Sequence, residues 1–229
     1  MDHQRVVLLD ALGTLVALEP PAPLLCRELA RRFGIEVTDS QARAALAAEI
    51  AYYRAHLDEG RDPQSLAALR TRCADVLRGA LPGGDRLAAA EPDAMTDTLL
   101  ASLRFSAFPD AEPALRALRA RGKRLVVVSN WDVSLNDVLE RVGLAPLLDG
   151  IVTSAGARSR KPASAIFQLA LEIVGAAPAE AMHVGDSLEE DVAGAQNAGI
   201  EPVLIRRADA PGPPGVLTIQ SLMELLGAA

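Results

Sequence analysis

The sequence predicts an α/β fold with a five-stranded parallel core that is interrupted by an all-helical insertion. Short apolar runs without polar alternation recur along the chain, as expected for strands that are buried on both faces. From residue 108 onward these runs alternate with segments of helical periodicity, a pattern that implies right-handed crossovers and a parallel sheet. A long block after the first strand shows helical spacing alone.

The predicted core domain comprises residues 1–16 and 108–229, and the predicted insertion comprises residues 17–107. The expected core strands and helices alternate in chain order, and a loop at residues 211–215 precedes the last helix. The strands are expected at residues 6–9, 123–130, 150–154, 181–185 and 203–205, and the helices at residues 112–121, 134–142, 162–174, 191–198 and 221–226.

The insertion is expected to contain four helices and no strand. The first helix ends at Gly34, where a left-handed cap is expected. The second begins at Thr38 or Asp39, the third at Asp62, and the fourth spans residues 92–103.

Composition limits the classes of partner. The chain of 229 residues is 50% hydrophobic and has a net charge of -7, which argues against nucleic acid and anionic membranes as partners. Cys26 and Cys73 lie in apolar helical patterns, so we expect free thiols. No stretch has the features of a signal peptide or a membrane span, so we expect a cytoplasmic protein, either a monomer or a homodimer.

Polar residues follow the predicted strands in a distinctive order. A carboxylate at the carboxyl end of a buried parallel strand lies where α/β proteins bind their ligands. One of only two lysines in the chain stands before a proline after the third strand. The segments are, in order, Asp10 with Gly13-Thr14, then Ser129-Asn130, then Lys161-Pro162, then Gly185-Asp186-Ser187 with Asp191.

These four segments together resemble the motifs of the haloacid dehalogenase-like (HAD) hydrolase superfamily, over about residues 6–205. The helical block resembles the cap domain that many members carry between the first and second motifs. The resemblance implies a Rossmann-like core in which Asp10 is the nucleophile and forms a covalent aspartyl intermediate. It also implies a Mg²⁺ ion bound by Asp10, the backbone carbonyl of Leu12, and Asp186, an oxygen-only set that suits a hard cation.

The resemblance implies roles for the remaining motif residues. Ser129 and Asn130 would donate hydrogen bonds to phosphoryl oxygens, and Lys161 would neutralise charge on Asp10 and the transferred group. Thr14 would also contact the substrate, and Ser187 and Asp191 would support the site from behind. A purely structural interpretation remains open for Thr14 and Ser129 as turn hydroxyls, and we favour a helix cap over catalysis for Asp132.

Leu12 departs from the family pattern. In HAD phosphatases the second residue after the nucleophile is an aspartate that acts as general acid and base, whereas leucine cannot transfer a proton. A general acid or base typically contributes about 10²–10⁴ in rate. The sequence therefore predicts a slow or specialised Mg²⁺-dependent phosphohydrolase that acts on a small anionic, phosphorylated substrate.

Two alternatives follow from Leu12. Relatives that act on 2-haloacids also lack this aspartate, because a halide ion leaves without a proton. Asp186 argues against this alternative, because it is a residue of the metal-dependent type. The second alternative is a HAD-fold binding or regulatory protein with little or no turnover. Phosphonoacetaldehyde hydrolases also lack the acid, but they need a lysine in the cap. No lysine lies between Leu15 and Phe105, which excludes this activity.

The predicted cap offers one candidate for substrate selection. Tyr53, Arg54 and His56 cluster on the second predicted helix, where Arg54 and His56 are suited to an anionic group. An equally strong interpretation is that Tyr53 packs inward and the other two are solvated.

Overall fold

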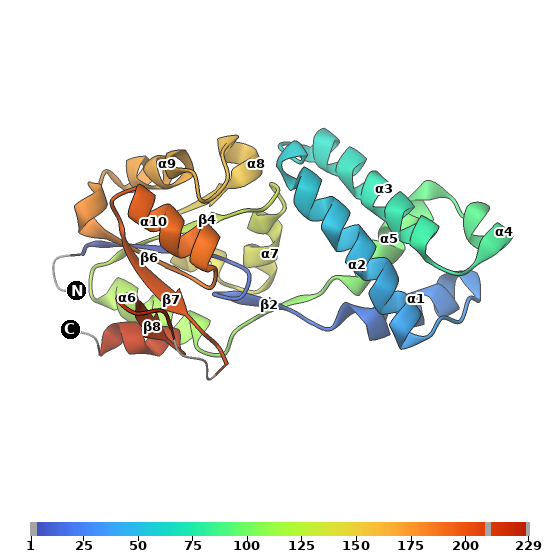
Figure 1. Cartoon of the computed structure of the whole chain (residues 1–229), viewed down its shortest axis with the longest axis horizontal. Coiled ribbons are helices and arrows are strands. Elements are labelled where there is room, and N and C mark those ends of the chain that lie inside the picture. Colours follow the sequence, from blue (N-terminus) through green and yellow to red (C-terminus); the bar gives the residue numbers. More distant parts are fainter. Residues whose placement is uncertain (1–3, 209–211, 228–229) are drawn as a thin grey trace. The chain divides into compact units, whose positions relative to one another are not determined.

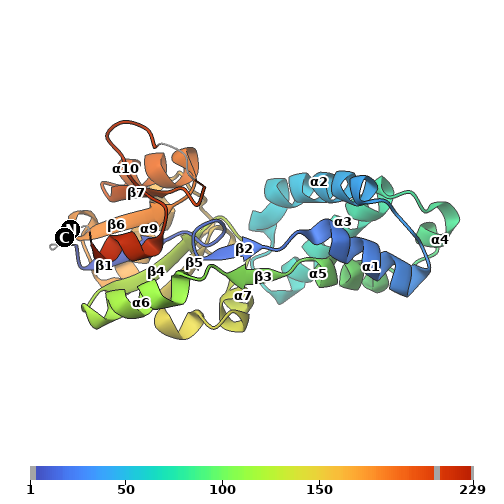
Figure 2. The same cartoon turned by 90° about the horizontal axis from the view of Figure 1, so that it is seen from below.

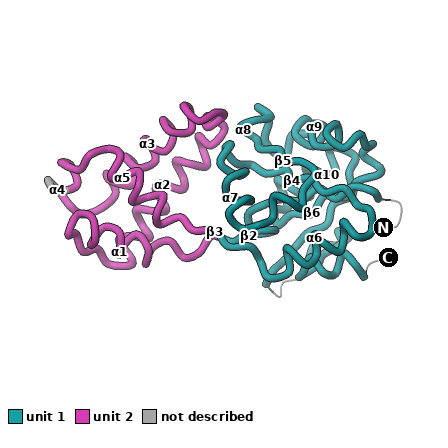
Figure 3. The backbone as a smooth tube through the Cα atoms, turned by 180° about the vertical axis from the view of Figure 1, so that it is seen from behind, with its two compact units in different colours: residues 1–17, 106–229 teal, residues 18–105 magenta. Residues whose placement is uncertain are grey.

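The computed structural model describes residues 4–208 and 212–227 (Figure 1). The chain divides into two compact units, of which the first combines Met1–Ala17 with Ser106–Ala229 and the second is Leu18–Phe105 (Figure 3). The second unit overlaps the insertion that the sequence predicts at residues 17–107.

The core is a parallel sheet with helices on both faces, which confirms the predicted fold class. The sheet has six strands rather than the predicted five, in the order β5-β4-β1-β6-β7-β8. Parallel pairs join each strand to the next, so β1 lies between β4 and β6. The strands are β1 (Val6–Leu9), β4 (Arg124–Ser129), β5 (Gly150–Thr153), β6 (Ala181–Gly185), β7 (Glu201–Ile205) and β8 (Leu217–Ile219).

Three short strands were not predicted. The edge strand β8 has three residues, of which only Ile219 is buried, so its pattern carries no buried-strand signal. The expectation of no strand after Leu15 is also wrong at its boundary, because β2 (Val16–Leu18) pairs with β3 (Phe105–Ala107) in a separate two-stranded sheet. Each of these segments has three residues and no continuous buried apolar run, which is the signal that predicted the other strands.

The two faces of the sheet are covered by different helices. Side chains alternate between faces along a strand, so Val6 and Leu8 point to the same face, where they pack with Phe167 of α9. Figures 1 and 2 show α10 and α6 on opposite sides of the sheet. The core helices are α6 (Ala111–Ala120), α7 (Leu135–Arg141), α8 (Ser154–Ala157), α9 (Ser164–Val174) and α10 (Gly194–Asn197), with short helical turns η2 (Ala145–Leu147), η3 (Pro178–Glu180) and η5 (Leu222–Leu226).

One core segment differs in helix type from the prediction. The expected helix over residues 191–198 starts earlier, as a π-helix, η4 (Leu188–Ala193), which runs directly into α10. The N-cap of η4 is Ser187, whose hydroxyl accepts a hydrogen bond from the Glu190 amide at 3.1 Å. π-Helical turns are rare and are frequent at functional sites.

The second unit is helical. Its helices are α1 (Pro21–Phe33), α2 (Asp39–His56), α3 (Pro63–Ala80), α4 (Gly84–Ala88) and α5 (Pro92–Ser102), with the turn η1 (Leu57–Glu59). The short α4 was not predicted. Thr38, rather than Asp39, caps α2, and the Asp62 carboxylate caps α3 by accepting the Ser65 amide at 2.8 Å. In the part of the chain that the structure describes, no helix combines the length and the apolar character needed to cross a bilayer.

One carboxyl group lies inside this helical unit. Glu49 of α2 is 4% exposed, and it hydrogen-bonds with Cys73 of α3. Burial raises the pKa of Glu49 to about 7, against a weaker opposing effect of the Cys73 hydrogen bond.

Glu49→Gln is expected to stabilise the protein at alkaline pH. Because the folded state binds the Glu49 proton more tightly than the unfolded state, stability should fall as the pH rises from about 4.5 to about 7 and then level off. The amide cannot ionise, so at pH 8 we expect a gain of about 1–2 kcal/mol, limited by the cost of burying the amide itself.

Urea unfolding as a function of pH measures this difference, with the exposed Glu36→Gln as the matched control. Equal effects of the two substitutions across the pH range would contradict the assignment of a destabilising charge to Glu49.

Candidate active site

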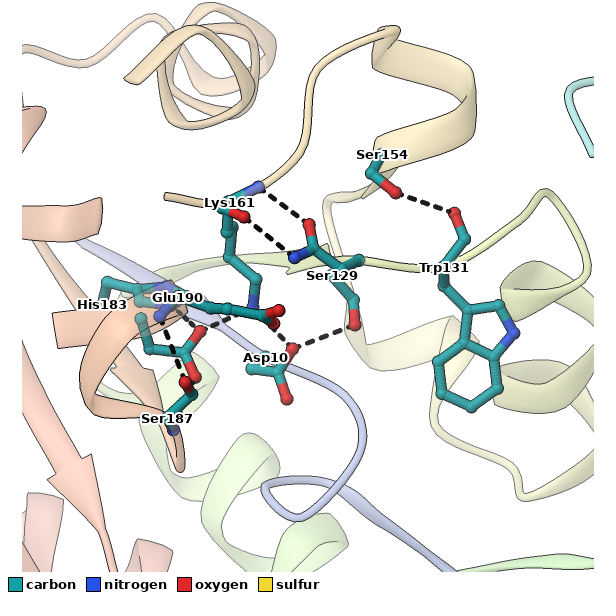
Figure 4. A network of polar contacts seen from close by, with 10 residues as sticks. Asp10, Ser129, Trp131, Ser154, Lys161, His183, Ser187 and Glu190 are labelled. Carbon is teal, nitrogen blue, oxygen red and sulfur yellow. Dashed lines mark hydrogen bonds and ion pairs between the residues drawn. The ribbon is translucent and has the colours of Figure 1, made fainter. Parts of the chain in front are cut away.

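Three strands of the core sheet carry polar residues to one cluster. Asp10 directly follows β1, Ser129 is the last residue of β4, and Asp186 directly follows β6. Because the strands are parallel neighbours in the order β4-β1-β6, their carboxyl ends lie at the same edge. Lys161, in the segment between α8 and α9, extends its side chain toward Asp10 (Figure 4).

The Lys161 ammonium lies between two carboxylates. Its Nζ donates to Asp10 Oδ1 at 2.6 Å and to Asp191 Oδ1 at 2.5 Å. Lys161 is 2% exposed, so its charge is removed from water and depends on these partners. Ser129 Oγ donates to the same Asp10 oxygen at 2.9 Å.

Asp191 is surrounded by donors. Asp191 Oδ1, which accepts from Lys161, also lies 2.8 Å from His183 Nε2. Asp191 Oδ2 accepts the Ser187 amide at 2.9 Å. Both Asp191 oxygens are therefore occupied, which suits a residue that orients Lys161. His183 is fully buried in β6 and had no predicted role, although a polar residue within an otherwise apolar strand is the signal that could have identified it.

The charges of this cluster depend on one another. Burial disfavours charge on Lys161, but the carboxylates of Asp10 and Asp191 hold the pKa of Lys161 above its ordinary value. Burial also disfavours charge on Asp191, yet Lys161 and His183 hold the pKa of Asp191 well below its usual range. Burial raises the pKa of Asp10, with Lys161 opposing and the Asp191 charge adding to the rise.

Asp186 completes a group of acidic side chains. The pKa of Asp186 rises to about 6, first because neighbouring atoms desolvate it and then because Asp10 and Asp191 carry like charges. Oxygen atoms of these three carboxylates all lie within 4.8 Å of one another. A divalent cation would relieve this repulsion, and carboxylate oxygens are the ligands that Mg²⁺ prefers.

The loop after β1 shapes the same region. Gly13 has a φ of 85°, and a methyl group there would overlap the Asp186 carboxylate, so glycine is needed for both conformation and space. The Ala11 carbonyl accepts the amides of Leu15 at 2.8 Å and Val16 at 2.9 Å, which closes the turn. Among the described residues, no hydrogen bond reaches the Leu12 carbonyl, which leaves this oxygen available as a ligand.

The Asn130 side chain holds the backbone of Lys161. Its Oδ1 accepts the Lys161 amide at 2.8 Å, and its Nδ2 donates to the Lys161 carbonyl at 3.0 Å. These contacts use one of the two Nδ2 hydrogens, so the hydrogen bond from Asn130 to a phosphoryl oxygen stays a prediction. Asp132 accepts the Ser134 amide at 2.7 Å in the turn that precedes α7, whose N-cap residue is Ser134.

The other expected substrate residues divide between the two units. Thr14 is fully buried, and its hydroxyl has no hydrogen-bond partner among the described residues. Tyr53, Arg54 and His56 lie on α2 in the helical unit, where Tyr53 packs against the apolar core and Arg54 is exposed. The His56 ring stacks on Tyr52 at a centroid distance of 4.0 Å.

A Rossmann-like α/β sheet with a carboxylate–lysine cluster at the carboxyl ends of its strands defines a class of hydrolytic enzymes. The chain belongs to the haloacid dehalogenase-like hydrolase family, whose family model matches residues 4–199. The resemblance drawn from the four motifs is thereby confirmed.

Similar proteins support this assignment. Haloacid dehalogenase-like hydrolase domain-containing protein 3 of Bos taurus is 43% identical over 95 residues, which cover 42% of this chain and 38% of the relative. Ribulose-1,5-bisphosphate 5-phosphatase of Halopiger xanaduensis is 38% identical over 101 residues, which cover 44% and 42%. The matched region thus spans about two fifths of the length of these curated relatives.

Solved structures resemble the whole chain. The HAD phosphatase of Thermococcus onnurineus has a TM-score of 0.68 at 26% identity, with 98% of this chain and 97% of that chain covered. The L-2-haloacid dehalogenase of Xanthobacter autotrophicus has a TM-score of 0.68 at 20% identity, with 99% and 100% covered, which shows a shared fold alone.

Gly185→Ala is expected to damage this site selectively. A methyl group at Gly185 would overlap the side chain of Asp191, and overpacking of this kind typically costs about 1–3 kcal/mol. Because Asp191 would have to move, the Lys161 contact should weaken as well. Thermal unfolding and hydrolase assays measure the two effects.

Gly79→Ala in α3 is the matched control, because a methyl group there meets no atom within 4 Å. Alanine is the better helix former, so this change should be stabilising by about 0.5–1 kcal/mol. A Gly185→Ala protein as stable and active as the control would contradict the described packing of Asp191.

Proposed function

We propose that the protein is a Mg²⁺-dependent phosphohydrolase that acts through an aspartyl intermediate on Asp10. The observation that carries the proposal is the buried Lys161 ammonium, 2.6 Å from Asp10 Oδ1, beside the carboxylate of Asp186. A lysine held between a candidate nucleophile and a second carboxylate is suited to stabilising negative charge on a transferred phosphoryl group.

In the first step an Asp10 oxygen forms a bond to the phosphorus of the substrate, and the bond from phosphorus to the leaving oxygen breaks. Asp10 Oδ1 is held by Ser129 and Lys161, and no hydrogen bond to Oδ2 is found in the described part of the chain. Fixing one oxygen orients the other, which reduces the entropic cost of attack. In the second step water attacks the phosphorus, the bond from phosphorus to the Asp10 oxygen breaks, and inorganic phosphate leaves with both protons of the water, which restores the Asp10 carboxylate.

Lys161 stays protonated in both steps. Its raised pKa makes it a fixed positive charge rather than a proton donor, and Asp191 keeps that charge in place from the other side. Asn130 fixes the backbone from which the lysine extends. The chain thus provides a preorganised charge on a lysine that is itself shielded from water, where electrostatic stabilisation is strong.

The residues that would hold Mg²⁺ are Asp10, Asp186 and the Leu12 carbonyl. Their oxygen-only chemistry, the crowding of the carboxylates and the absence of a donor to Leu12 among the described residues all fit a hard divalent cation. A bound Mg²⁺ supplies charge neutralisation, which lets an anionic nucleophile approach an anionic phosphoryl group.

Leu12 restricts the proposed substrates. Its side chain is 37% exposed and apolar, so it offers no proton to a leaving alkoxide. Substrates whose leaving group is stable as an anion, such as acyl phosphates, do not need that proton in the first step. We therefore favour a specialised phosphohydrolase, and Tyr53, Arg54 and His56 of the helical unit remain our candidates for substrate selection.

The test of the reaction class combines substrate screening with detection of the intermediate. Phosphorylated compounds and 2-haloacids are screened for turnover, and intact-mass measurement follows the Asp10 adduct. We expect phosphate release that requires Mg²⁺, with a phosphoryl adduct in the wild-type protein that is lost in Asp10→Asn. Asp132→Asn, a buried aspartate outside the cluster, is the matched control.

Mg²⁺ should raise the melting temperature of the wild-type protein and leave that of Asp186→Ala unchanged.

In the substrate screen, halide release without Mg²⁺ would favour a dehalogenase, a second candidate that Leu12 supports because halide leaves without a proton. The absence of any adduct and of any turnover would favour a HAD-fold binding or regulatory protein.

The role of Leu12 is tested by a series of aryl phosphates with leaving groups of different pKa. Rates of the wild-type protein should fall steeply as the leaving group becomes more basic, because no side chain protonates it. Leu12→Asp should accelerate the poorest leaving groups most, by an amount toward the lower end of the general acid range of about 10²–10⁴.

Leu12→Asn is the matched control, since asparagine has a shape similar to that of aspartate but no carboxylic acid. Asp10→Asn in the Leu12→Asp background should abolish the gain. An equal acceleration of good and poor leaving groups would mean that the missing acid does not limit the reaction.

A further inference from the structure

Arg207 lies in the segment after β7, outside the four motifs. Its Nη2 donates to the Thr14 carbonyl, and its Nε lies 3.5 Å from the Gly13 carbonyl. These two carbonyls belong to the loop that also contains Leu12. The guanidinium therefore holds the metal-binding loop of the proposed function at the two residues that follow the Leu12 carbonyl.

Arg207 is itself fixed in place by a second set of contacts. Its Nη1 donates to Asp110 Oδ1 at 2.7 Å and to Asp110 Oδ2 at 2.8 Å. The guanidinium also lies 3.9 Å above the Phe108 ring, a favourable cation–π geometry. Asp110 Oδ2 further accepts Ser221 Oγ and the Leu222 amide, each at 2.8 Å.

These contacts join three distant parts of the chain. The loop after β1, the segment after β3 and the segment after β7 meet at one guanidinium whose side chain is 21% exposed. The Asp110 side chain is 15% exposed, and the Arg207 and Ser221 hydrogen bonds hold the pKa of Asp110 below its ordinary value despite burial. The pair therefore remains charged and partly desolvated.

Apart from Arg207, no hydrogen bond reaches the Gly13 and Thr14 carbonyls among the described residues, whereas the Ala11, Leu15 and Val16 carbonyls accept backbone amides. The Ala11 carbonyl anchors the turn from its start, and Gly13 needs a positive φ to pass Asp186. Glycine allows a wide range of backbone conformations, so contacts to the Gly13 and Thr14 carbonyls favour one of them. Arg207 supplies these contacts, and its planar fork suits two adjacent carbonyls and one carboxylate at the same time.

We propose that Arg207 is a positioning residue that fixes the loop after β1 so that the Leu12 carbonyl is preorganised as a metal ligand. The inference rests on the proposed Mg²⁺ site. Residues that orient metal ligands without touching the metal typically contribute 10–100-fold to metal affinity.

The test measures Mg²⁺ affinity by isothermal titration calorimetry and amide hydrogen exchange of residues 11–16 without metal. Arg207→Met is expected to weaken Mg²⁺ binding at least tenfold and to speed exchange of the Leu15 and Val16 amides. Arg207→Lys should restore part of both properties, because a lysine reaches one carbonyl but lacks the fork.

Ser221→Ala is the matched control. It removes one hydrogen bond to Asp110 and leaves the contacts between Arg207 and the loop in place. A merely structural role of the network predicts that both variants lower the melting temperature and leave Mg²⁺ affinity and loop exchange unchanged, and this result would overturn the proposal. If the wild-type protein binds no Mg²⁺, the proposed metal site is refuted. Hydrogen exchange then still decides whether Arg207 fixes the loop after β1.

Discussion

The ammonium of Lys161 is removed from water, and its charge is stabilised by the carboxylates of Asp10 and Asp191. Removing one partner from a buried ion pair typically costs about 3–5 kcal/mol, because an uncompensated charge is left behind. The geometry of the site follows from this requirement. Asp191 must reach Lys161, so Gly185 must lack a side chain, and the π-helix after Ser187 carries Asp191 back toward β6.

The parallel sheet makes such a cluster possible. Strands β4, β1 and β6 are neighbours, and each ends in a polar residue or is followed by one at the same edge. Side chains that are more than 100 residues apart in the chain, such as Ser129 and Asp10, then come within hydrogen-bond distance. The same edge gathers more negative than positive charge. Desolvation and this excess together raise the pKa of Asp186, and the excess is the basis of the cation affinity that we propose.

In HAD phosphatases with an aspartate at this position, one residue offers both a backbone carbonyl for the metal and an acidic side chain for proton transfer. Leu12 offers only the first of these. The backbone of Leu12 can still serve a metal, since any residue provides a carbonyl, whereas its side chain cannot transfer a proton. In the mechanism that we propose, electrostatic stabilisation by Lys161 is therefore retained without general acid catalysis by residue 12. An enzyme of this kind depends on the chemistry of its substrate for the departure of the leaving group, which is a physical reason for narrow specificity.

The sequence by itself determined the α/β fold, the strands with strong apolar runs and the order of the four motifs, because buried strands and the residues after them are local in the chain. It did not reveal β8, whose three residues carry no periodicity. Nor did it reveal the roles of His183, Asn130 and Arg207. Asn130 acts on the Lys161 backbone and Arg207 on the loop after β1, both far away in the sequence, whereas His183 meets Asp191 because the π-helix turns the chain back toward β6. Such contacts arise only when the chain folds, so the tertiary structure alone decided them.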